Sequence, residues 1–187
     1  MVMEERSIRM FRERYNLLVV LGPTASGKTG LAVRLARRIG GEILSADSRQ
    51  VYRGMDLGTG KDLSEYGREG EAVPVHLIDI CDPGDEFSLF AFQDRFYRAF
   101  QQISQRGKIP VMAGGTGLYL DSILRGYQMT AVSENRDLRD QLAGEGMEVL
   151  RRRFRLLCPD AHNTTDLLER KRVIRAIEIA EFVRDHP

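Results

Sequence analysis

Residues 22–29, which read GPTASGKT, constrain the fold of this chain more than any other feature. They match the pattern G-x-x-x-x-G-K-[ST] and lie between an apolar run, residues 16–21, and a stretch of helical periodicity, residues 29–39. Glycines allow such a loop to wrap tightly, so that its backbone N–H groups point at a polyphosphate. Lys28 would place a positive charge on the terminal phosphates, and the Thr29 hydroxyl would ligate Mg²⁺. The residues predicted to bind a nucleotide or a diphosphate are Gly22, Pro23, Thr24, Ala25, Ser26, Gly27, Lys28 and Thr29.

Strand-like segments recur after this loop, at residues 42–45, 73–80 and 109–113. The last is a continuous apolar run, which is typical of a strand buried on both faces of a parallel sheet. Before it, Ser88 is a candidate helix N-cap, and apolar residues follow at helical spacing as far as Gly107. The repeated order of strand, helix and strand predicts an α/β fold, a P-loop NTPase-like parallel sheet flanked by helices.

The end of the chain has a different pattern. We expect an α/β core at residues 1–126 and a helical, Arg-rich extension at residues 127–187. Polar helical periodicity covers residues 135–157, and a last helix ends at about Phe182. We expect a break in the first stretch at Gly144 and Gly146. The candidate N-cap of the last helix is Asn163 or Thr164.

Composition excludes several classes of protein. Of the 187 residues, 42% are hydrophobic and the formal net charge is +1, so a disordered chain is not expected. There is no apolar run long enough to span a membrane, and the first residues lack the apolar core of a signal peptide. The two cysteines, Cys81 and Cys158, form no metal-binding spacing and suit a reducing cytoplasm, where we expect the protein to reside.

Two further motifs follow predicted strands. Residues 45–61, SADSRQVYRGMDLGTGK, contain Asp47, which can hold Mg²⁺ through water or take a proton from a nucleophile. Residues 113–120, AGGTGLYL, surround Thr116 with glycines that let a ligand approach the backbone. Because carboxyl ends of parallel strands share one edge of a sheet, both motifs should lie beside the phosphate-binding loop. Donors and acceptors suited to reading a base edge follow Asp47, namely Ser48, Arg49 and Gln50.

Charge is unevenly distributed. Residues 151–175 contain eight basic and three acidic side chains, an excess of +5 in a chain whose total is +1. A solvated helix face and a contact with a phosphate backbone both explain this excess, and composition does not choose between them.

These motifs together resemble the tRNA dimethylallyltransferase family, also called tRNA isopentenyltransferases. GPTASGKT, SADSRQVYRGMD.GTGK, a DP…FS…F stretch from Asp82 to Phe92 and GGTGLYL recur in the family's order, and ERKRVIRAIEI at residues 169–179 is similar to its R-x-x-RA-[LI]-E segment. The resemblance implies transfer of a dimethylallyl group from dimethylallyl diphosphate to N6 of the adenosine next to the tRNA anticodon, with Mg²⁺ as cofactor. It also implies a later Arg-containing segment of the family that has no counterpart here.

The resemblance assigns roles to individual residues. Lys28, Thr29 and the loop backbone would hold the diphosphate and Mg²⁺, with Thr29 as the metal ligand. Asp47 would accept the N6 proton, and Thr116 would approach the reacting base, so the implied catalytic residues are Asp47, Thr116 and Lys28. The implied contacts with the tRNA anticodon stem-loop are Asp47, Ser48, Arg49, Gln50, Arg139, Lys171, Arg172 and Arg175.

Other functions are compatible with the residues alone. A small P-loop kinase would share the loop and use Asp47 as the base for a hydroxyl. Prenyl transfer to free adenine nucleotides, and diphosphate binding without catalysis, are further alternatives.

Overall fold

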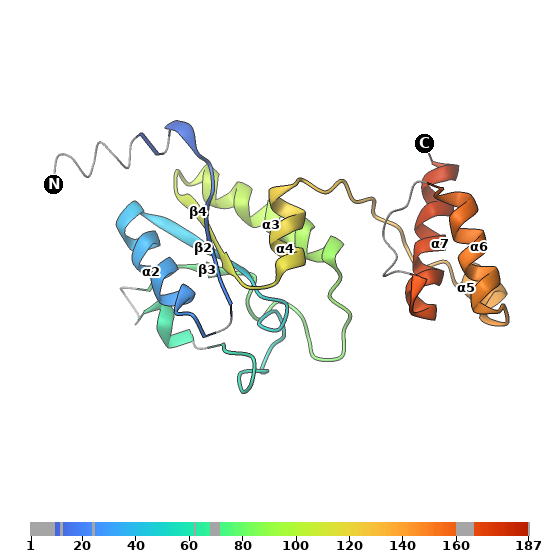
Figure 1. Ribbon diagram of the computed structural model, residues 1–187. Helices are drawn as coiled ribbons and strands as arrows, with labels where there is room; N and C mark the ends of the chain where they lie inside the picture. The colour runs from blue at the N-terminus through green and yellow to red at the C-terminus, as the bar shows by residue number, and fades with distance from the viewer. Residues whose placement is uncertain are drawn as a thin grey trace. The chain divides into compact units, whose positions relative to one another are not determined.

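The computed structural model describes residues 10–11, 13–23, 25–61, 63–67, 72–159 and 167–186. The chain forms two compact units, Met1–Tyr127 and Gln128–Pro187 (Figure 1), and each is described here by itself. The sequence predicts this boundary one residue earlier, between residues 126 and 127.

The first unit contains a sheet of four parallel strands, in the order β1-β4-β2-β3. The strands are β1 (Leu18–Leu21), β2 (Gly41–Ala46), β3 (Val75–His76) and β4 (Ile109–Gly114). Gly114 of β4 is in register with Leu21 on one side and with Ala46 on the other. The carboxyl ends of β1, β4 and β2 therefore lie at one level of the sheet, and the segments that follow them share one edge.

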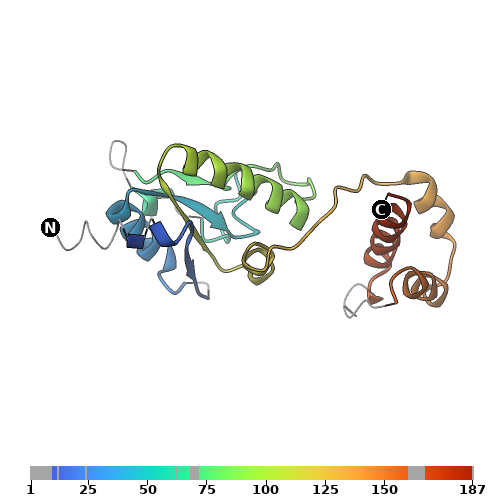
Figure 2. The ribbon, with the colours of Figure 1, turned by 90° about the horizontal axis from the view of Figure 1, so that it is seen from above.

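Helices cover both faces of this sheet, as Figures 1 and 2 show. Helix α2 (Lys28–Ile39) packs on one face, in a core that includes Ala32, Ile43 and Val111. Helices α3 (Leu89–Gln105) and α4 (Gly117–Leu124) pack on the other, in a core that includes Leu44 and Met112. Neighbouring residues of β2 and β4 thus point to opposite apolar cores, as expected for strands buried on both faces. The α/β fold predicted from the sequence is confirmed.

Several helix boundaries also agree with the sequence. The Ser88 side chain caps α3 by accepting a hydrogen bond from the backbone N–H of Ala91 (3.1 Å). Gly40 ends α2 in the left-handed conformation that glycine adopts easily.

The predicted strand at residues 73–80 is wrong in its extent. Only Val75 and His76 belong to β3, because Leu77 and Asp79 have positive φ angles of 69° and 54°. These left-handed residues interrupt the extended backbone. The backbone N–H groups of Asp79 and Ile80 instead donate to the carbonyl oxygens of Gln50 and Val51. A short 3₁₀ helix, η1 (Leu63–Tyr66), precedes β3.

The second unit contains three helices among its described residues: α5 (Arg136–Ala143), α6 (Met147–Leu157) and α7 (Arg170–Asp185). Their core consists of Leu138, Leu142, Leu150, Phe154, Val173 and Ile177. Gly144 and Gly146 separate α5 from α6, as the sequence predicts. The candidate caps Asn163 and Thr164 lie outside the described residues. Helix α7 begins at Arg170, after both candidates, and ends three residues beyond Phe182, at Asp185. In the described part of the chain, no helix has both the length and the apolar character that crossing a bilayer requires.

The close approach of β4 to β2 predicts that a side chain at Gly114 destabilises the sheet. A Cβ atom at this position would lie 2.2 Å from the backbone carbonyl oxygen of Ala46, which cannot move without disturbing the strand. Gly114→Ala should therefore lower the free energy of unfolding by about 1–3 kcal/mol. Gly117→Ala is the matched control, because a Cβ there meets nothing within 4 Å, and it should change stability by less than about 1 kcal/mol. Urea unfolding checks both, and equal stability of the two variants would contradict the prediction.

Candidate phosphate and acceptor site

The loop at residues 22–29 connects β1 to α2 in the structure, as the motif requires. Gly27, which precedes α2, has a φ angle of 74°, and Ala25 has a φ angle of 63°. Left-handed residues within such a loop turn successive N–H groups toward one side and create a concave site for anions. Nζ of Lys28 donates a hydrogen bond to the carbonyl oxygen of Pro23 in the same loop (3.1 Å). Thr24 lies outside the described residues.

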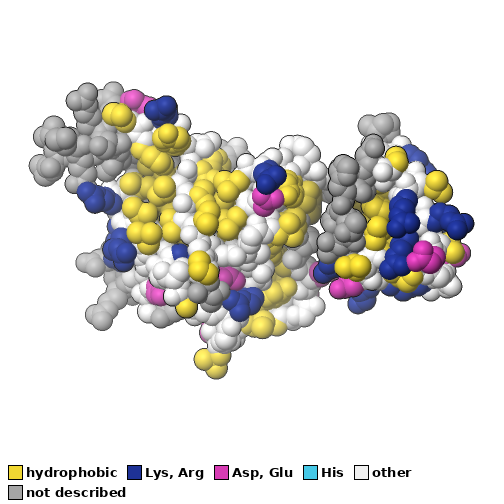
Figure 3. All heavy atoms as spheres, in the orientation of Figure 1, with side chains coloured by type: hydrophobic (Ala, Val, Ile, Leu, Met, Phe, Trp, Pro, Cys, Tyr) yellow, Lys and Arg dark blue, Asp and Glu magenta, His cyan; other side chains and the backbone are white. Residues whose placement is uncertain are grey.

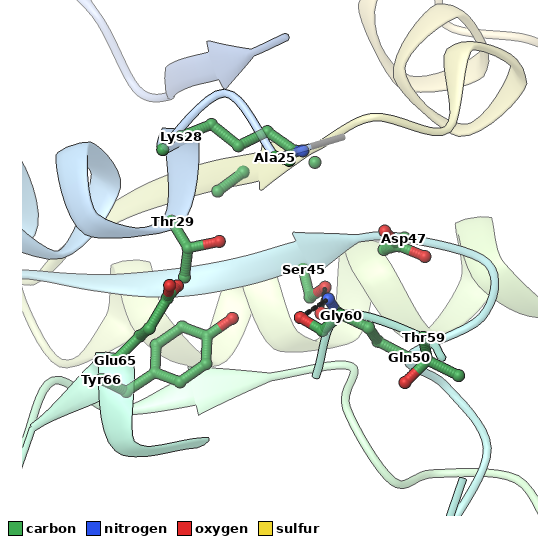
Figure 4. A pocket seen from close by; sticks show the side chains of 13 residues that line it. Ala25, Lys28, Thr29, Ser45, Asp47, Gln50, Thr59, Gly60, Glu65 and Tyr66 are labelled. Atoms are coloured by element: carbon green, nitrogen blue, oxygen red, sulfur yellow. Dashed lines mark hydrogen bonds between the residues drawn. The ribbon is translucent and has the colours of Figure 1, made fainter. Parts of the chain in front are cut away.

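A cavity of about 180 Å³ lies at the carboxyl edge of the sheet (Figure 4). The segments that follow β1 and β2 contribute to it, together with the last two residues of β4. The predicted site residues that line the cavity are Ala25, Gly27, Lys28, Thr29, Asp47 and Gln50. The other lining residues are Ser45, Thr59, Gly60, Glu65, Tyr66, Ala113 and Gly114.

Asp47 directly follows β2, and its carboxylate is held by its own segment. Oδ1 of Asp47 accepts a hydrogen bond from the backbone N–H of Arg49 (3.0 Å), and Nε of Arg49 lies 4.0 Å from the same oxygen. The Asp47 side chain is 15% exposed. Asp47 therefore lines the cavity and keeps a small contact with solvent.

Thr116 links the glycine-rich motif to the Asp47 segment. Its backbone N–H donates to the carbonyl oxygen of Ala46 (3.1 Å), and its hydroxyl oxygen accepts from the backbone N–H of Ser48 (2.9 Å). The Thr116 hydroxyl also donates to Oγ of Ser48 (3.3 Å). Thr116 does not line the cavity itself; its hydrogen bonds fix the two residues on either side of Asp47.

The charges in the cavity favour a cation together with an anionic ligand. Among the described residues that line the cavity, Lys28 is the one basic side chain, whereas Asp47 and Glu65 are both acidic. Burial, followed by the charges of Glu65 and Asp47, raises the pKa of Tyr66 to about 12, so its hydroxyl stays protonated at neutral pH. A diphosphate in this space needs more positive charge than Lys28 supplies. The oxygen donors of Thr29, Asp47 and Glu65 are of the kind that Mg²⁺ prefers, with water and phosphate as its other ligands.

Glu65 and Tyr66 were missed by the sequence analysis. They belong to η1, which the chain brings to the cavity through contacts with α2. No local pattern marks such a tertiary placement. Thr59 and Gly60 belong to the motif at residues 45–61, which we expected beside the predicted phosphate-binding loop. Nothing else in the sequence singles out these two residues.

Some predicted residues lie beside the cavity rather than in it. Gly22, Pro23 and Ser26 belong to the predicted phosphate-binding loop but do not line the cavity, and Ser48 is hydrogen-bonded to Thr116. Arg49 faces a second cavity of about 530 Å³, which it lines together with residues that include Tyr52, Met55 and Pro83.

Arg139 and Arg175, predicted to contact RNA, are joined to a buried carboxylate within the second unit. The Glu178 side chain is 1% exposed, and its two oxygens accept hydrogen bonds from Nε and Nη2 of Arg139 (2.7 and 2.8 Å). Nη1 of Arg175 donates to Oε2 of Glu178 (3.1 Å), and Nη2 of Arg175 donates to the carbonyl oxygen of Val132 (2.6 Å). Both arginines therefore stabilise the helical unit directly.

Other basic side chains of this unit are exposed. Arg152, Arg155 and Lys171 make no ion pair or side-chain hydrogen bond in the described part of the chain, and Arg172 lies 3.5 Å from Glu169. Figure 3 shows Lys and Arg side chains gathered on the visible face of this unit. Such a face is suited to a polyanion.

A parallel sheet with a GPTASGKT loop and a shared cavity at its carboxyl edge defines a P-loop NTPase-like α/β protein. Family models described as IPP transferase and isopentenyl transferase match residues 50–186 and 15–69. The chain belongs to this family of tRNA dimethylallyltransferases, which confirms the resemblance found in the sequence.

Individual relatives agree with this assignment. The chain is 63% identical to tRNA dimethylallyltransferase 1 of Geotalea daltonii over 168 residues, which cover 90% of this chain and 53% of the relative. Its structure is similar to that of a tRNA isopentenylpyrophosphate transferase from Bacillus halodurans (38% identity, TM-score 0.57, 89% of this chain and 55% of the other). It is also similar to a eukaryotic dimethylallyltransferase acting on tRNA (27% identity, TM-score 0.71, 91% and 44%). The chain spans about half the length of the curated relatives it matches.

The Glu178 cluster predicts a pH-dependent stability of the second unit. Burial alone would raise the pKa of Glu178, but the hydrogen bonds from Arg139, from the Asn135 N–H and from Arg175 outweigh it and lower this pKa. The stability that Glu178 contributes through its lowered pKa is fully present above its pKa in the unfolded chain, about 4.3. It is lost as the pH falls through the pKa of Glu178 in the folded chain. Glu178→Gln should therefore weaken the unit by about 2–3 kcal/mol at pH 7, and the difference from the parent should shrink below about pH 4.3.

Hydrogen exchange of peptides from α5, α6 and α7 measures this stability within the complete chain. Glu134→Gln is the matched control, because Glu134 also pairs with Arg139 but is 59% exposed. It should change stability by less than about 1 kcal/mol. A difference between Glu178→Gln and the parent that stays constant from pH 7 to pH 3 would contradict the assignment.

Proposed function

We propose that the first unit binds dimethylallyl diphosphate and that this chain takes part in transferring the dimethylallyl group to N6 of an adenosine next to the anticodon of a tRNA, in the cytoplasm. Membership of the tRNA dimethylallyltransferase family supports this reaction. The observation that carries the proposal is that Lys28 and Asp47, which follow different strands, line one cavity.

The proposed reaction is a substitution at the first carbon of the dimethylallyl group. The bond from this carbon to the diphosphate oxygen breaks, a bond to N6 of the adenosine forms, and the N6 proton passes to the carboxylate of Asp47. Negative charge develops on the leaving diphosphate, where Lys28 and the N–H groups of the loop stabilise it. Asp47 is a suitable base because its carboxylate lines the cavity and is partly exposed.

Mg²⁺, when bound, would supply further neutralisation of the diphosphate. Thr29 would hold it through its hydroxyl, with the carboxylate of Glu65 as a nearby oxygen donor. Lys28 would release the carbonyl oxygen of Pro23 and turn toward the phosphates.

The acceptor adenosine must leave the base stack to reach this cavity. Ser48, Arg49 and Gln50 are placed beside Asp47 and would contact the displaced base and its neighbours. In the second unit, the exposed Lys171 and Arg172 would contact the RNA backbone, which agrees with their position on the solvent side of α7. Arg139 and Arg175 would contribute through what remains exposed of their guanidinium groups.

Asp47→Asn tests the base. The amide cannot accept the N6 proton, so transfer from isotope-labelled dimethylallyl diphosphate to an anticodon stem-loop should fall by about 10²–10⁴-fold. Diphosphate affinity, measured by calorimetry, should change by less than about threefold, because the P-loop is intact. Glu86→Gln is the control, since it removes an exposed carboxylate of the same unit that lines neither cavity. An equal loss of transfer in the two variants, or none in Asp47→Asn, would remove Asp47 from this role.

Lys28→Ala tests the phosphate site. Loss of a charge-assisted hydrogen bond should weaken binding of dimethylallyl diphosphate by about ten- to a hundredfold. Lys108→Ala, which removes an exposed lysine just before β4, should bind as the parent does. The melting temperature of the parent with dimethylallyl diphosphate is compared with that with ATP, each with Mg²⁺. The ligand that binds more tightly raises the melting temperature further, so this comparison distinguishes a prenyltransferase from a kinase. Unchanged affinity in Lys28→Ala, or stronger stabilisation by ATP, would refute the assignment.

A further inference from the structure

Lys61 ends the motif at residues 45–61, and its ammonium group is buried beneath it. The side chain is 1% exposed. Nζ donates hydrogen bonds to the carbonyl oxygen of Tyr52 (2.9 Å) and to Oδ1 of Asp79, and it lies 2.8 Å from Oδ1 of Asp56. An ammonium group has three protons, so these three acceptors satisfy it completely. Burial alone would lower the pKa of Lys61, but the bonds to Asp56 and Asp79 outweigh it and raise the pKa.

These contacts join two segments that are distant in the sequence. Tyr52 and Asp56 belong to the loop after β2, whereas Asp79 follows β3. Backbone hydrogen bonds already connect the segments at one end, from Asp79 N–H to Gln50 and from Arg53 N–H to Cys81. The Lys61 ammonium connects them through side chains and draws the end of the loop back to its beginning.

The backbone of the second segment is adapted to this contact. Asp79 has a left-handed conformation with a φ angle of 54°, which aspartate and asparagine adopt more readily than other residues with a Cβ atom. Such conformations persist where the surroundings impose them, and they are concentrated at functional sites. Here the conformation places the Asp79 carboxylate against Lys61.

The same loop forms one wall of the cavity. Thr59 and Gly60, the two residues before Lys61, line it together with Gln50 (Figure 4). The Gln50 side chain spans this wall: Nε2 donates to the carbonyl oxygen of Gly60 (3.1 Å), and Oε1 accepts from Oγ of Ser45 (3.4 Å). Thr59 also lines the second cavity, on the side of Arg49. We therefore expect movement of Lys61 to shift the wall formed by Gln50, Thr59 and Gly60, where the proposed acceptor adenosine would bind, and to leave the loop at residues 22–29 in place.

We propose that Lys61 is a positioning residue: its buried ammonium group, bound to Tyr52, Asp56 and Asp79, fixes residues 47–60 as the acceptor wall of the cavity and takes no part in binding the diphosphate. This inference rests on the proposed function for the identity of the acceptor, but the ordering of the wall is a property of the chain alone. Lysine is required rather than arginine, because a compact ammonium group meets three acceptors at one point and a planar guanidinium group does not.

The test compares Lys61→Met, Lys61→Arg and the parent, with Lys108→Met as the control for loss of a lysine at an exposed position. Hydrogen exchange follows peptides from residues 47–61 and 77–81, and peptides from α3 report on the rest of the unit. In Lys61→Met and Lys61→Arg, exchange in the two segments should be at least about tenfold faster than in the parent, with α3 unchanged. Affinity for dimethylallyl diphosphate should stay within about threefold, whereas affinity for an anticodon stem-loop should fall by about tenfold.

A second variant separates charge from backbone conformation. Asp79→Asn removes the negative charge but keeps a side chain that tolerates left-handed φ angles. It should reproduce the effect of Lys61→Met, and the double variant should be no worse than either single one, because both remove the same contact.

Other results would overturn the proposal. Unchanged exchange in the two segments would show that Lys61 does not order the wall. Equally faster exchange in α3 would show a general loss of stability, and full rescue by Lys61→Arg would show that charge alone suffices. If the parent chain binds dimethylallyl diphosphate but not the stem-loop, the proposed acceptor is wrong, and the exchange measurements still decide the role of Lys61.

Discussion

The register of three parallel strands is the constraint on which the site depends. Leu21, Gly114 and Ala46 lie at one level of the sheet, so the segments that follow β1, β4 and β2 leave it side by side. The absence of a side chain at Gly114 allows β4 to approach the carbonyl oxygen of Ala46. From that point Thr116 reaches Ser48, and Asp47 is held facing the cavity that Lys28 lines. The glycine-rich loop and a carboxylate that are distant in the sequence thus line one cavity, with no hydrogen bond or ion pair between their described residues.

The sequence predicted those parts of the structure that local patterns determine. The α/β fold, the cap at Ser88 and the break near Gly144 follow from apolar runs, capping residues and glycines that act over a few positions. The predicted strand at residues 73–80 failed because Leu77 and Asp79 adopt left-handed conformations that tertiary contacts impose. Glu65 and Tyr66 were missed for the same reason, since packing of η1 against α2 brings them to the cavity.

The arginine-rich part of the chain shows why charge excess is a weak guide to function. The sequence offered a solvated face and an RNA contact as explanations for residues 151–175, and the structure adds an internal use. Arg170 donates to the carbonyl oxygens of Leu142 and Ala143 near the end of α5, where unpaired carbonyl groups attract cations. Arg175 is bound to Glu178. Counting charges cannot separate these side chains from exposed ones such as Lys171. The difference depends on how the helices pack, which decides whether a basic side chain contacts a neighbouring element or solvent.

The two halves of the proposed reaction differ in how the chain builds them. Residues 22–29 are contiguous, and one strand and one helix hold the phosphate loop, so its geometry depends on local structure. The wall at residues 47–60 has no helix or strand of its own, and its order comes from Thr116, from the segment after β3 and from Lys61. Local free energies of opening are lowest where few regular hydrogen bonds hold the backbone. In the proposed reaction this loop admits a nucleotide displaced from RNA, and the buried ion cluster around Lys61 would set the loop's geometry independently of residues 22–29.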